Sequence, residues 1–295
     1  MTTRLTMVLA MEAGVLACLL TVSVDQYAHR RVQHLGGVNT WGYRGSVALA
    51  KRPGEFRMVM AGGSQAFGWG VAPAETAIAY LRTLIEGEWI KSGTDRTVTA
   101  FNLGALGLPA HGYASRIERF RYLEPDVICL FVDLVDSLPF AVMPPAESGV
   151  TALTGYVPML PIVLAEQGWQ VGNAMQTADR ALYRVVGGPA PSRADRRQMV
   201  HRAIDAALQG ASFAVVVLPA PAGTAQRAEH EALMASIASR AAADQRLQLV
   251  DLSAQPLLRA DDLRLDGVNF GAAGHSLVAN EIATAVAALI RREAA

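Results

Sequence analysis

Residues 56–70 read FRMVMAGGSQAFGWG and decide the fold that the rest of the chain must complete. The run 56–61 is short and mostly apolar, which predicts a buried β-strand. Gly62 and Gly63 end this strand, and Ser64 follows them at the strand-to-turn junction. A serine between glycines at such a turn can meet a substrate where backbone N–H groups converge on an oxyanion. The glycine spacing fits neither a dinucleotide-binding nor a P-loop motif.

Strand and helix patterns alternate along the chain beyond this stretch. The predicted strands cover residues 56–61, 97–102, 125–133, 211–218 and 247–252. The predicted helices cover residues 76–87, 112–123, 193–209, 225–243 and 272–292. Such alternation predicts a mostly parallel sheet with helices on both faces, whose ligands bind at the carboxyl ends of the strands.

The composition excludes several classes of protein. The chain has 295 residues, 26 basic and 26 acidic side chains, 52% hydrophobic residues and two cysteines. It is therefore neither a disordered chain nor a disulfide scaffold, and its net charge of zero gives no support to nucleic acid as a partner. Cys18 and Cys129 both lie in apolar runs, which predicts no disulfide within the domain. No metal-ligand spacing and no cofactor motif is found, so neither a metal nor a cofactor is expected.

The N-terminal residues 5–24 read LTMVLAMEAGVLACLLTVSV and predict a membrane anchor over residues 1–24. Twenty helical residues span about 30 Å, the thickness of one hydrocarbon core. Glu12 costs roughly 2.5–3.5 kcal/mol in the middle of such a segment, and the surrounding apolar residues offset it. A cleaved signal peptide and a buried helix of a soluble protein remain the alternatives. The charged residues on either side of this segment do not determine its orientation in the membrane.

The remaining chain is divided by composition. Residues 25–54 are polar and rich in glycine, which predicts a juxtamembrane linker, and residues 55–295 are long enough for one α/β domain. Within that domain, residues 138–188 are rich in proline, glycine and large apolar residues and form a predicted insertion. We expect it to be an ordinary helical insertion, with a lid or a second membrane-contacting surface as alternatives.

Several short motifs occur in an order that resembles the SGNH hydrolase superfamily, also called GDSL esterases. They are NTWGYR at 39–44, GS with FGWG at 63–70, NLGALG at 102–107, PDV at 125–127 and DGVNFGAAGH at 266–275. The resemblance covers roughly residues 40–290 and is to membrane-anchored members. It implies an α/β, three-layer α/β/α flavodoxin-like fold with a mostly parallel sheet, preceded by one N-terminal transmembrane helix. It also implies acyl-ester chemistry.

The resemblance carries roles to individual positions. Ser64 matches the nucleophile, and Gly63 stands where the family often has Asp. Gly104 matches the glycine whose N–H joins the oxyanion hole. Asp266 matches the acid of the closing motif.

Two positions depart from the family pattern. Asn269 stands where the family has the catalytic histidine, and a neutral amide cannot accept the serine proton. The family's third motif holds an Asn–Asp pair, but this chain offers Asp133 or Asp136 without the Asn. Loss of the base costs about 10⁶ in turnover in a complete serine-hydrolase triad, and loss of an oxyanion donor costs about 10² to 10³.

Three further side chains are candidates for the site. Two histidines are candidates for a relocated base. His111 lies in the loop after the second motif, and His275 lies at the start of the last helix, where the resemblance implies a structural role as the alternative. Trp69 follows the serine turn and either stacks on a sugar ring or fills a gap beside the sheet.

These observations predict a membrane-anchored serine esterase or acyl-transfer enzyme, with weak or unconventional catalysis. Its predicted substrate is an O-acylated, for example O-acetylated, carbohydrate of the cell envelope or a small ester, and its globular domain is expected in the periplasm. The alternative is an inactive pseudoenzyme that binds glycan or scaffolds an envelope assembly.

Overall fold

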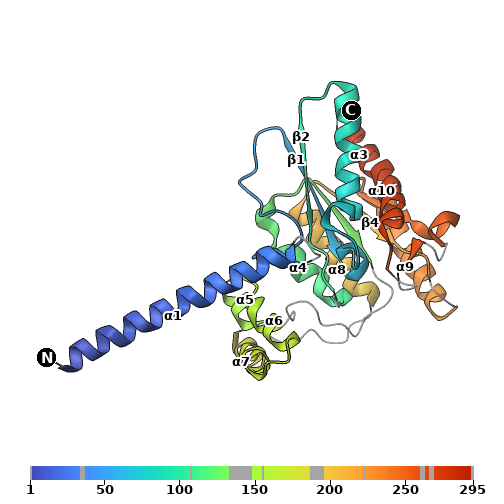
Figure 1. Cartoon of the computed structure of the whole chain (residues 1–295). Coiled ribbons are helices and arrows are strands. Elements are labelled where there is room, and N and C mark those ends of the chain that lie inside the picture. Colours follow the sequence, from blue (N-terminus) through green and yellow to red (C-terminus); the bar gives the residue numbers. More distant parts are fainter. Residues whose placement is uncertain are drawn as a thin grey trace. The chain divides into compact units, whose positions relative to one another are not determined.

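The computed structural model describes residues 2–33, 37–106, 108–132, 148–154, 156–186, 196–221, 224–259, 263–265 and 269–293 (Figure 1). The chain forms two compact units. One unit joins Met1–Gly42 to Glu147–Gly188, and the other joins Tyr43–Ala146 to Pro189–Ala295. Most of the predicted insertion at 138–188 therefore belongs to the same unit as the N-terminal helix.

The second unit is built on a parallel sheet. Its described strands are β1 (Glu55–Gly62), β2 (Thr97–Asn102), β3 (Val127–Phe131), β4 (Phe213–Leu218) and β5 (Leu247–Asp251). They are paired in the order β2-β1-β3-β4-β5, with every pairing parallel. This is the flavodoxin-like strand order. The fold class predicted from the sequence is therefore confirmed.

Helices cover both faces of this sheet. One face packs against α4 (Tyr113–Arg119), α8 (Arg196–Gly210) and α9 (Thr224–Ala243). The opposite face packs against α3 (Ala77–Ser92) and α10 (Ala272–Glu293), which lie side by side in Figure 1. Residues of β1 alternate between the two cores, with Val59 in the first and Met60 in the second.

Short helical turns connect these elements. They are α2 (Ser64–Phe67) and the 3-10 turns Pro73–Glu75, Ala110–Gly112, Arg121–Leu123, Leu252–Ala254 and Pro256–Arg259. The helix predicted at 112–123 is consequently one α-helix between two 3-10 turns, and the helix predicted at 76–87 continues to Ser92.

The first unit holds four described helices, namely α1 (Thr2–Gln33), α5 (Gly149–Thr154), α6 (Leu160–Glu166) and α7 (Gln170–Val186). Helix α1 continues past residue 24, where the sequence predicts a linker. Its polar end is held by packing, because Asp25 and His29 are buried. The Met159 N–H donates to Asp25 Oδ1 at 2.9 Å, and the Leu160 N–H and Tyr156 hydroxyl donate to the same carboxylate.

Helix α1 is long and apolar enough to cross a membrane over Thr6–Arg30, and none of its apolar window is buried. An N-terminal helix of this kind is either a membrane span or a signal sequence. Helix α10 passes the same test of length and composition, but Val278, Ile282 and Val286 lie in the core beside the sheet. Helix α10 is therefore a core helix.

Candidate active site

The serine predicted as nucleophile follows the strand at which the strand order reverses. Ser64 begins α2 directly after β1, which lies between β2 and β3. Ligands of open parallel sheets bind at this switch point. Gly62 makes the turn possible, because a Cβ at Gly62 would lie 2.3 Å from the carbonyl oxygen of Phe131. Ser64 is 8% exposed, and its hydroxyl has no hydrogen-bond partner among the described residues.

A buried arginine holds the chain that follows the serine. Arg44 donates from Nη1 to the carbonyl oxygens of Phe67 and Gly68 at 2.7 and 2.8 Å, and from Nη2 to that of Val71 at 2.7 Å. Its guanidinium also stacks over the Phe67 ring. Burial lowers the pKa of Arg44 to about 10, so the side chain stays a cation at neutral pH. The Arg44 guanidinium therefore stabilises the turn after Ser64 through hydrogen bonds to its carbonyl oxygens.

The second motif packs directly against the serine turn. A Cβ at Gly104 would lie 2.2 Å from the backbone nitrogen of Phe67, so only glycine fits there. The Gly104 N–H donates to Asn102 Oδ1 at 2.9 Å, and Asn102 Nδ2 donates to the Phe67 carbonyl oxygen at 3.2 Å. The resemblance assigns the Gly104 N–H to the oxyanion hole, and in this structure that N–H donates to the Asn102 side chain.

The C-terminal motif lies against the same turn. Arg264 and Phe270 form an antiparallel bridge, and the Leu265 N–H donates to the Asn269 carbonyl oxygen at 2.9 Å. A Cβ at Gly70 would lie 2.4 Å from Leu265 Cδ1. The structure therefore brings the loop that carries Asn269 beside the loop that follows Ser64. Asn269 itself is buried. The predicted acid Asp266 and the predicted Asp133 lie outside the described residues.

His275 is buried at the start of α10, and neither of its ring nitrogens has a hydrogen-bond partner among the described residues. Phe270 contacts the edge of its ring. Burial, with a smaller contribution from the Arg44 charge, lowers the pKa of His275 to about 4. A neutral imidazole with so low a pKa is a weak acceptor for a serine proton near pH 7.

His275 should make the folded chain sensitive to acid. Its pKa is lower folded than unfolded, so stability falls as the pH drops from 6.5 and levels off below about 4. The loss through this group is expected to be about 3 kcal/mol. Urea unfolding of the full chain in detergent at several pH values measures it. In His275→Leu the loss between these pH values should shrink by that amount, whereas an unchanged pH profile would contradict the assignment.

The other predicted site residues are less constrained. His111 is exposed in the turn Ala110–Gly112, and no contact joins it to Ser64 among the described residues. Trp69 is half-buried next to the serine turn. Gly63 has a φ of −87°, which any residue adopts, so its backbone does not require glycine.

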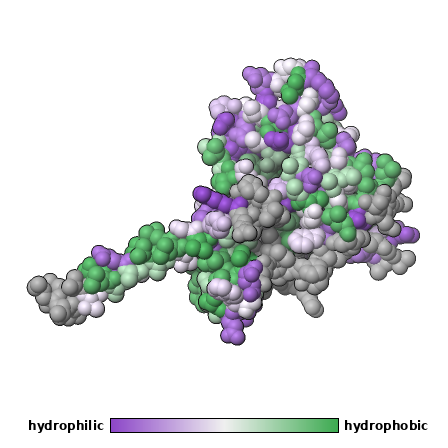
Figure 2. Space-filling model, viewed as in Figure 1, coloured by the Kyte–Doolittle hydropathy of each residue, from purple (hydrophilic) through white to green (hydrophobic). Residues whose placement is uncertain are grey.

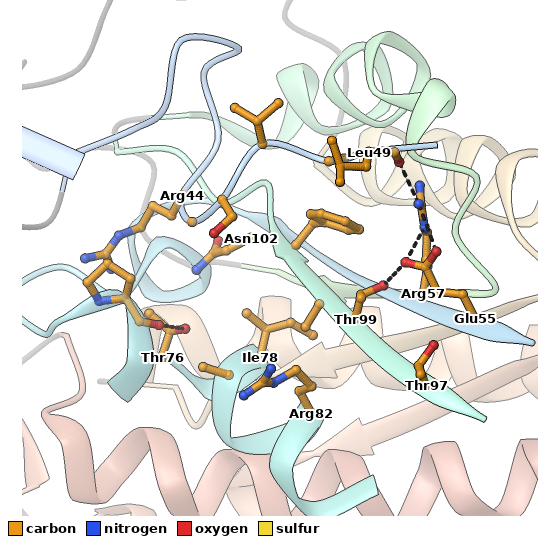
Figure 3. Close-up of a pocket in the computed structure, with 18 of the residues that line it drawn as sticks. Arg44, Leu49, Glu55, Arg57, Thr76, Ile78, Arg82, Thr97, Thr99 and Asn102 are labelled. Atoms are coloured by element: carbon orange, nitrogen blue, oxygen red, sulfur yellow. Dashed lines mark hydrogen bonds and ion pairs between the residues drawn. The ribbon is translucent and has the colours of Figure 1, made fainter. Parts of the chain in front are cut away.

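A cavity of about 450 Å³ lies along the edge strand β2 (Figure 3). Arg44 and Asn102 line one end, and Thr97 and Thr99 lie further along the strand. Ser64 does not line this cavity. Arg44 and Asn102 nevertheless link it to the serine turn, because both donate hydrogen bonds to the Phe67 carbonyl oxygen.

A buried ion pair forms part of the cavity wall. Glu55 accepts hydrogen bonds from Arg57 Nε at 2.9 Å, from the Thr99 hydroxyl at 2.6 Å and from the Arg52 N–H at 2.8 Å. Arg57 also donates to the Leu49 carbonyl oxygen (Figure 3). Burial alone would raise the pKa of Glu55, but these hydrogen bonds and the Arg57 charge lower it to about 2.

Replacing Glu55 by glutamine is expected to destabilise the fold by about 3 kcal/mol at pH 7, because the buried Arg57 loses its counter-charge. The folded pKa lies below the unfolded value of 4.5, so the stabilisation is present above pH 4.5 and is lost as the pH falls toward 2. Urea unfolding at pH 7 and pH 3 checks both statements. Equal stability of variant and wild type at pH 7 would contradict them.

Sequence reasoning missed the supporting roles of Arg44 and Asn102. Arg44 is separated from the Phe67 carbonyl by more than twenty residues, and no local pattern predicts that contact. The role of Asn102 could have been predicted in part. A polar residue at the carboxyl end of a strand in a parallel sheet lies at the edge where ligands bind.

The comparisons with known proteins find likeness in structure only. No protein-family model matches the chain, and no curated protein matches it by sequence. Among solved structures, a family 3 carbohydrate esterase from Clostridium thermocellum matches with a TM-score of 0.46 and 14% identity, over 80% of this chain and 98% of that one. A G-D-S-L family protein from Desulfitobacterium hafniense matches with a TM-score of 0.42 and 16% identity, over 77% and 98%.

A third match is a two-domain esterase active on acetylated mannans, with a TM-score of 0.42 and 14% identity over 81% of this chain. The match covers 50% of that esterase. The three matched structures are thus two esterases and a protein of the G-D-S-L family.

Proposed function

We propose that this chain is an SGNH-type serine esterase or acyl-transfer enzyme, anchored in a membrane by α1. The observation that carries the proposal is the placement of Ser64. It stands at the switch point of the sheet, on a turn held by Arg44 and packed against Gly104, and the loop of Asn269 lies beside the loop that follows it. A hydroxyl at such a turn is positioned for attack on an acyl group.

The proposed reaction passes the acyl group through Ser64. The Oγ atom bonds to the ester carbonyl carbon, the ester C–O bond breaks, and the alcohol leaves with the serine proton. Water then releases the acid, or a second hydroxyl accepts the acyl group. Among the described residues no imidazole bonds to the Ser64 hydroxyl, and Asn269 stands at the position of the family's base, so we expect turnover to be slow.

We propose an O-acylated carbohydrate of the cell envelope as the substrate, with O-acetylated glycan as the first to test. Trp69 follows the serine turn and is half-buried, and we expect its side chain to stack on a sugar ring. The exposed apolar surface of α1 supports a membrane anchor, and an envelope substrate requires the globular unit to lie on the periplasmic side.

A binding function without catalysis is the second candidate. Asn269, in the position of the family's base, is buried in the loop beside the serine turn, and an amide cannot take up the serine proton. In this account the site holds the glycan or scaffolds an envelope assembly and leaves the ester intact.

Restoring a histidine separates the two candidates. Hydrolysis of p-nitrophenyl acetate is measured for the full chain, for Asn269→His and for Asn280→His, an exposed control on α10. A positioned base contributes about 10²-fold or more, so Asn269→His should gain by that order over a measurable wild-type rate. Wild-type hydrolysis at the buffer rate, with a gain only in Asn269→His, would favour the binding function. No gain in Asn269→His over Asn280→His would contradict the placement of position 269.

A further inference from the structure

Helix α7 presents three different faces. The first packs inside its own unit, where a Cβ at Gly172 would lie 2.4 Å from the backbone nitrogen of Ala165. On the same face, Gln176 donates to the Pro161 carbonyl oxygen at 3.2 Å, and Asp179 accepts from the Val150 N–H at 2.8 Å. Leu182 takes part in this packing as well, because a Cβ at Gly149 of α5 would lie 2.5 Å from Leu182 Cγ. The face of α7 that packs within the unit is therefore formed by small, polar and apolar contacts together.

The second face is apolar and exposed. Exposed residues that recur at helical spacing form this face, which we call the apolar stripe: Val171, Ala174, Ala178 and Val185. Val185 is 83% exposed, and Trp169, just before the helix, is 60% exposed. Figure 2 shows hydrophobic residues gathered along α1 and on the bundle that contains α7. An amphipathic helix normally buries its apolar face, so an exposed apolar stripe indicates a surface that binds another molecule or a membrane.

The third face is polar and carries positive charge. It consists of Asn173, Thr177, Arg180 and Arg184, which follow the same helical spacing. Arg180 donates only to the neighbouring Gln176 among described residues, at 3.4 Å. Arginines on one face and apolar residues with a tryptophan on another are the pattern of a helix that lies in a membrane interface.

Contacts within the unit place α7 near the end of the membrane segment. The exposed apolar run of α1 ends at Val24, and the next residue, Asp25, accepts hydrogen bonds from the N–H groups that begin α6. Helix α6 in turn packs against α7. In Figure 1, α1 lies along the page while α7 is seen nearly end-on, so α7 runs across the direction of α1.

We infer that α7 lies in the headgroup region of the bilayer that α1 crosses, with the apolar stripe toward the acyl chains and the arginines at the lipid phosphates. The inference rests on the anchor proposed above. It names the lipid bilayer as the partner, because the stripe belongs to the same unit as the membrane segment, and α6, which packs against α7, begins at the N–H groups that Asp25 binds. A second protein over the stripe is the competing occupant.

Spin labels in the full chain test this inference in phosphatidylcholine vesicles that contain phosphatidylglycerol. Cys18 is first replaced by serine, while buried Cys129 stays, because burial raises the pKa of its thiol to about 12 and keeps it unreactive. Single cysteines then replace Ala178 and Val185 on the apolar stripe, and Thr177 and Arg184 on the polar face. Collisions of each label with oxygen, which concentrates in lipid, and with a water-soluble nickel chelate are measured.

Labels at Ala178 and Val185 should collide more with oxygen than with nickel, and labels at Thr177 and Arg184 the reverse. Equal, nickel-dominated values on both faces would overturn the inference, and so would protection of the stripe from both reagents, which would indicate a protein cover. Labels at Leu16 and Leu20 of α1 serve as the control for the anchor. If they report lipid while the stripe reports water, only the placement of α7 fails; if they report water, the proposed anchor fails as well.

Discussion

Replacing Ser64 by alanine is expected to reduce hydrolysis of p-nitrophenyl acetate to the rate of the buffer alone. The variant removes the hydroxyl that directly follows β1 at the switch point of the sheet. The fold-change should be smaller than the ~10⁶ lost when a complete triad loses its serine, because no imidazole assists the wild-type hydroxyl among the described residues.

Ser115→Ala provides the matched control for this variant. Ser115 is exposed on α4 and donates to the Gly112 carbonyl oxygen, so its loss should leave the rate unchanged. Both variants must unfold at the wild-type urea concentration for the comparison to hold. Equal rates of wild type and Ser64→Ala above the buffer rate would mean that another group performs the hydrolysis.

Gly104→Ala is expected to lower the free energy of unfolding by about 3 kcal/mol, at the upper end of overpacking effects. The added Cβ would lie 2.2 Å from the Phe67 nitrogen and 2.5 Å from the Ala66 carbonyl carbon. Both are backbone atoms of the serine turn, so relief of the clash must move that turn. Ser64-dependent hydrolysis should therefore fall together with stability.

Gly87→Ala is the control, because nothing lies within 4 Å of a Cβ at Gly87 in the middle of α3. This substitution should stabilise the chain by up to about 1 kcal/mol through helix propensity. Urea unfolding of both variants in detergent measures the contrast. A Gly104→Ala variant as stable as Gly87→Ala would show that the second motif does not pack on the serine turn.

Much of the fold could be predicted because its causes are local. Strands β3 and β4 are continuous, fully buried apolar runs, and β4 at 213–218 lies within the strand predicted at 211–218. The strand predicted at 97–102 coincides with β2, which is partly exposed. The glycines at the ends of the strands could also be identified from the sequence. The structure explains them, because it leaves no room for a side chain at Gly62 or Gly104. The end of α1 could not be read in this way, because Asp25 and His29 extend the helix through contacts with residues 156–160.

The motifs name candidate site residues, whose catalytic roles stay predictions, but they do not predict the contacts between these residues. Ser64, Gly104 and Asn269 were found from motifs, and the structure places their loops together. The Asn102 bond to the Gly104 N–H was not foreseeable, because it depends on the conformation of one side-chain amide. The stripe on α7 could not be predicted as exposed, because the apolar face of a helix is usually buried, and the exposure of Val171 and Val185 is seen only in the folded unit.

The most direct measurement is to locate the acyl group after the full chain reacts with p-nitrophenyl acetate. Acid quenching, proteolysis and mass spectrometry of the peptides identify the modified residue. The account predicts an acetyl group on Ser64 in the wild type, none there in Ser64→Ala, and faster accumulation or turnover in Asn269→His. An acetyl group found only on other residues, at equal levels in wild type and Ser64→Ala, would contradict the claim that Ser64 is the nucleophile.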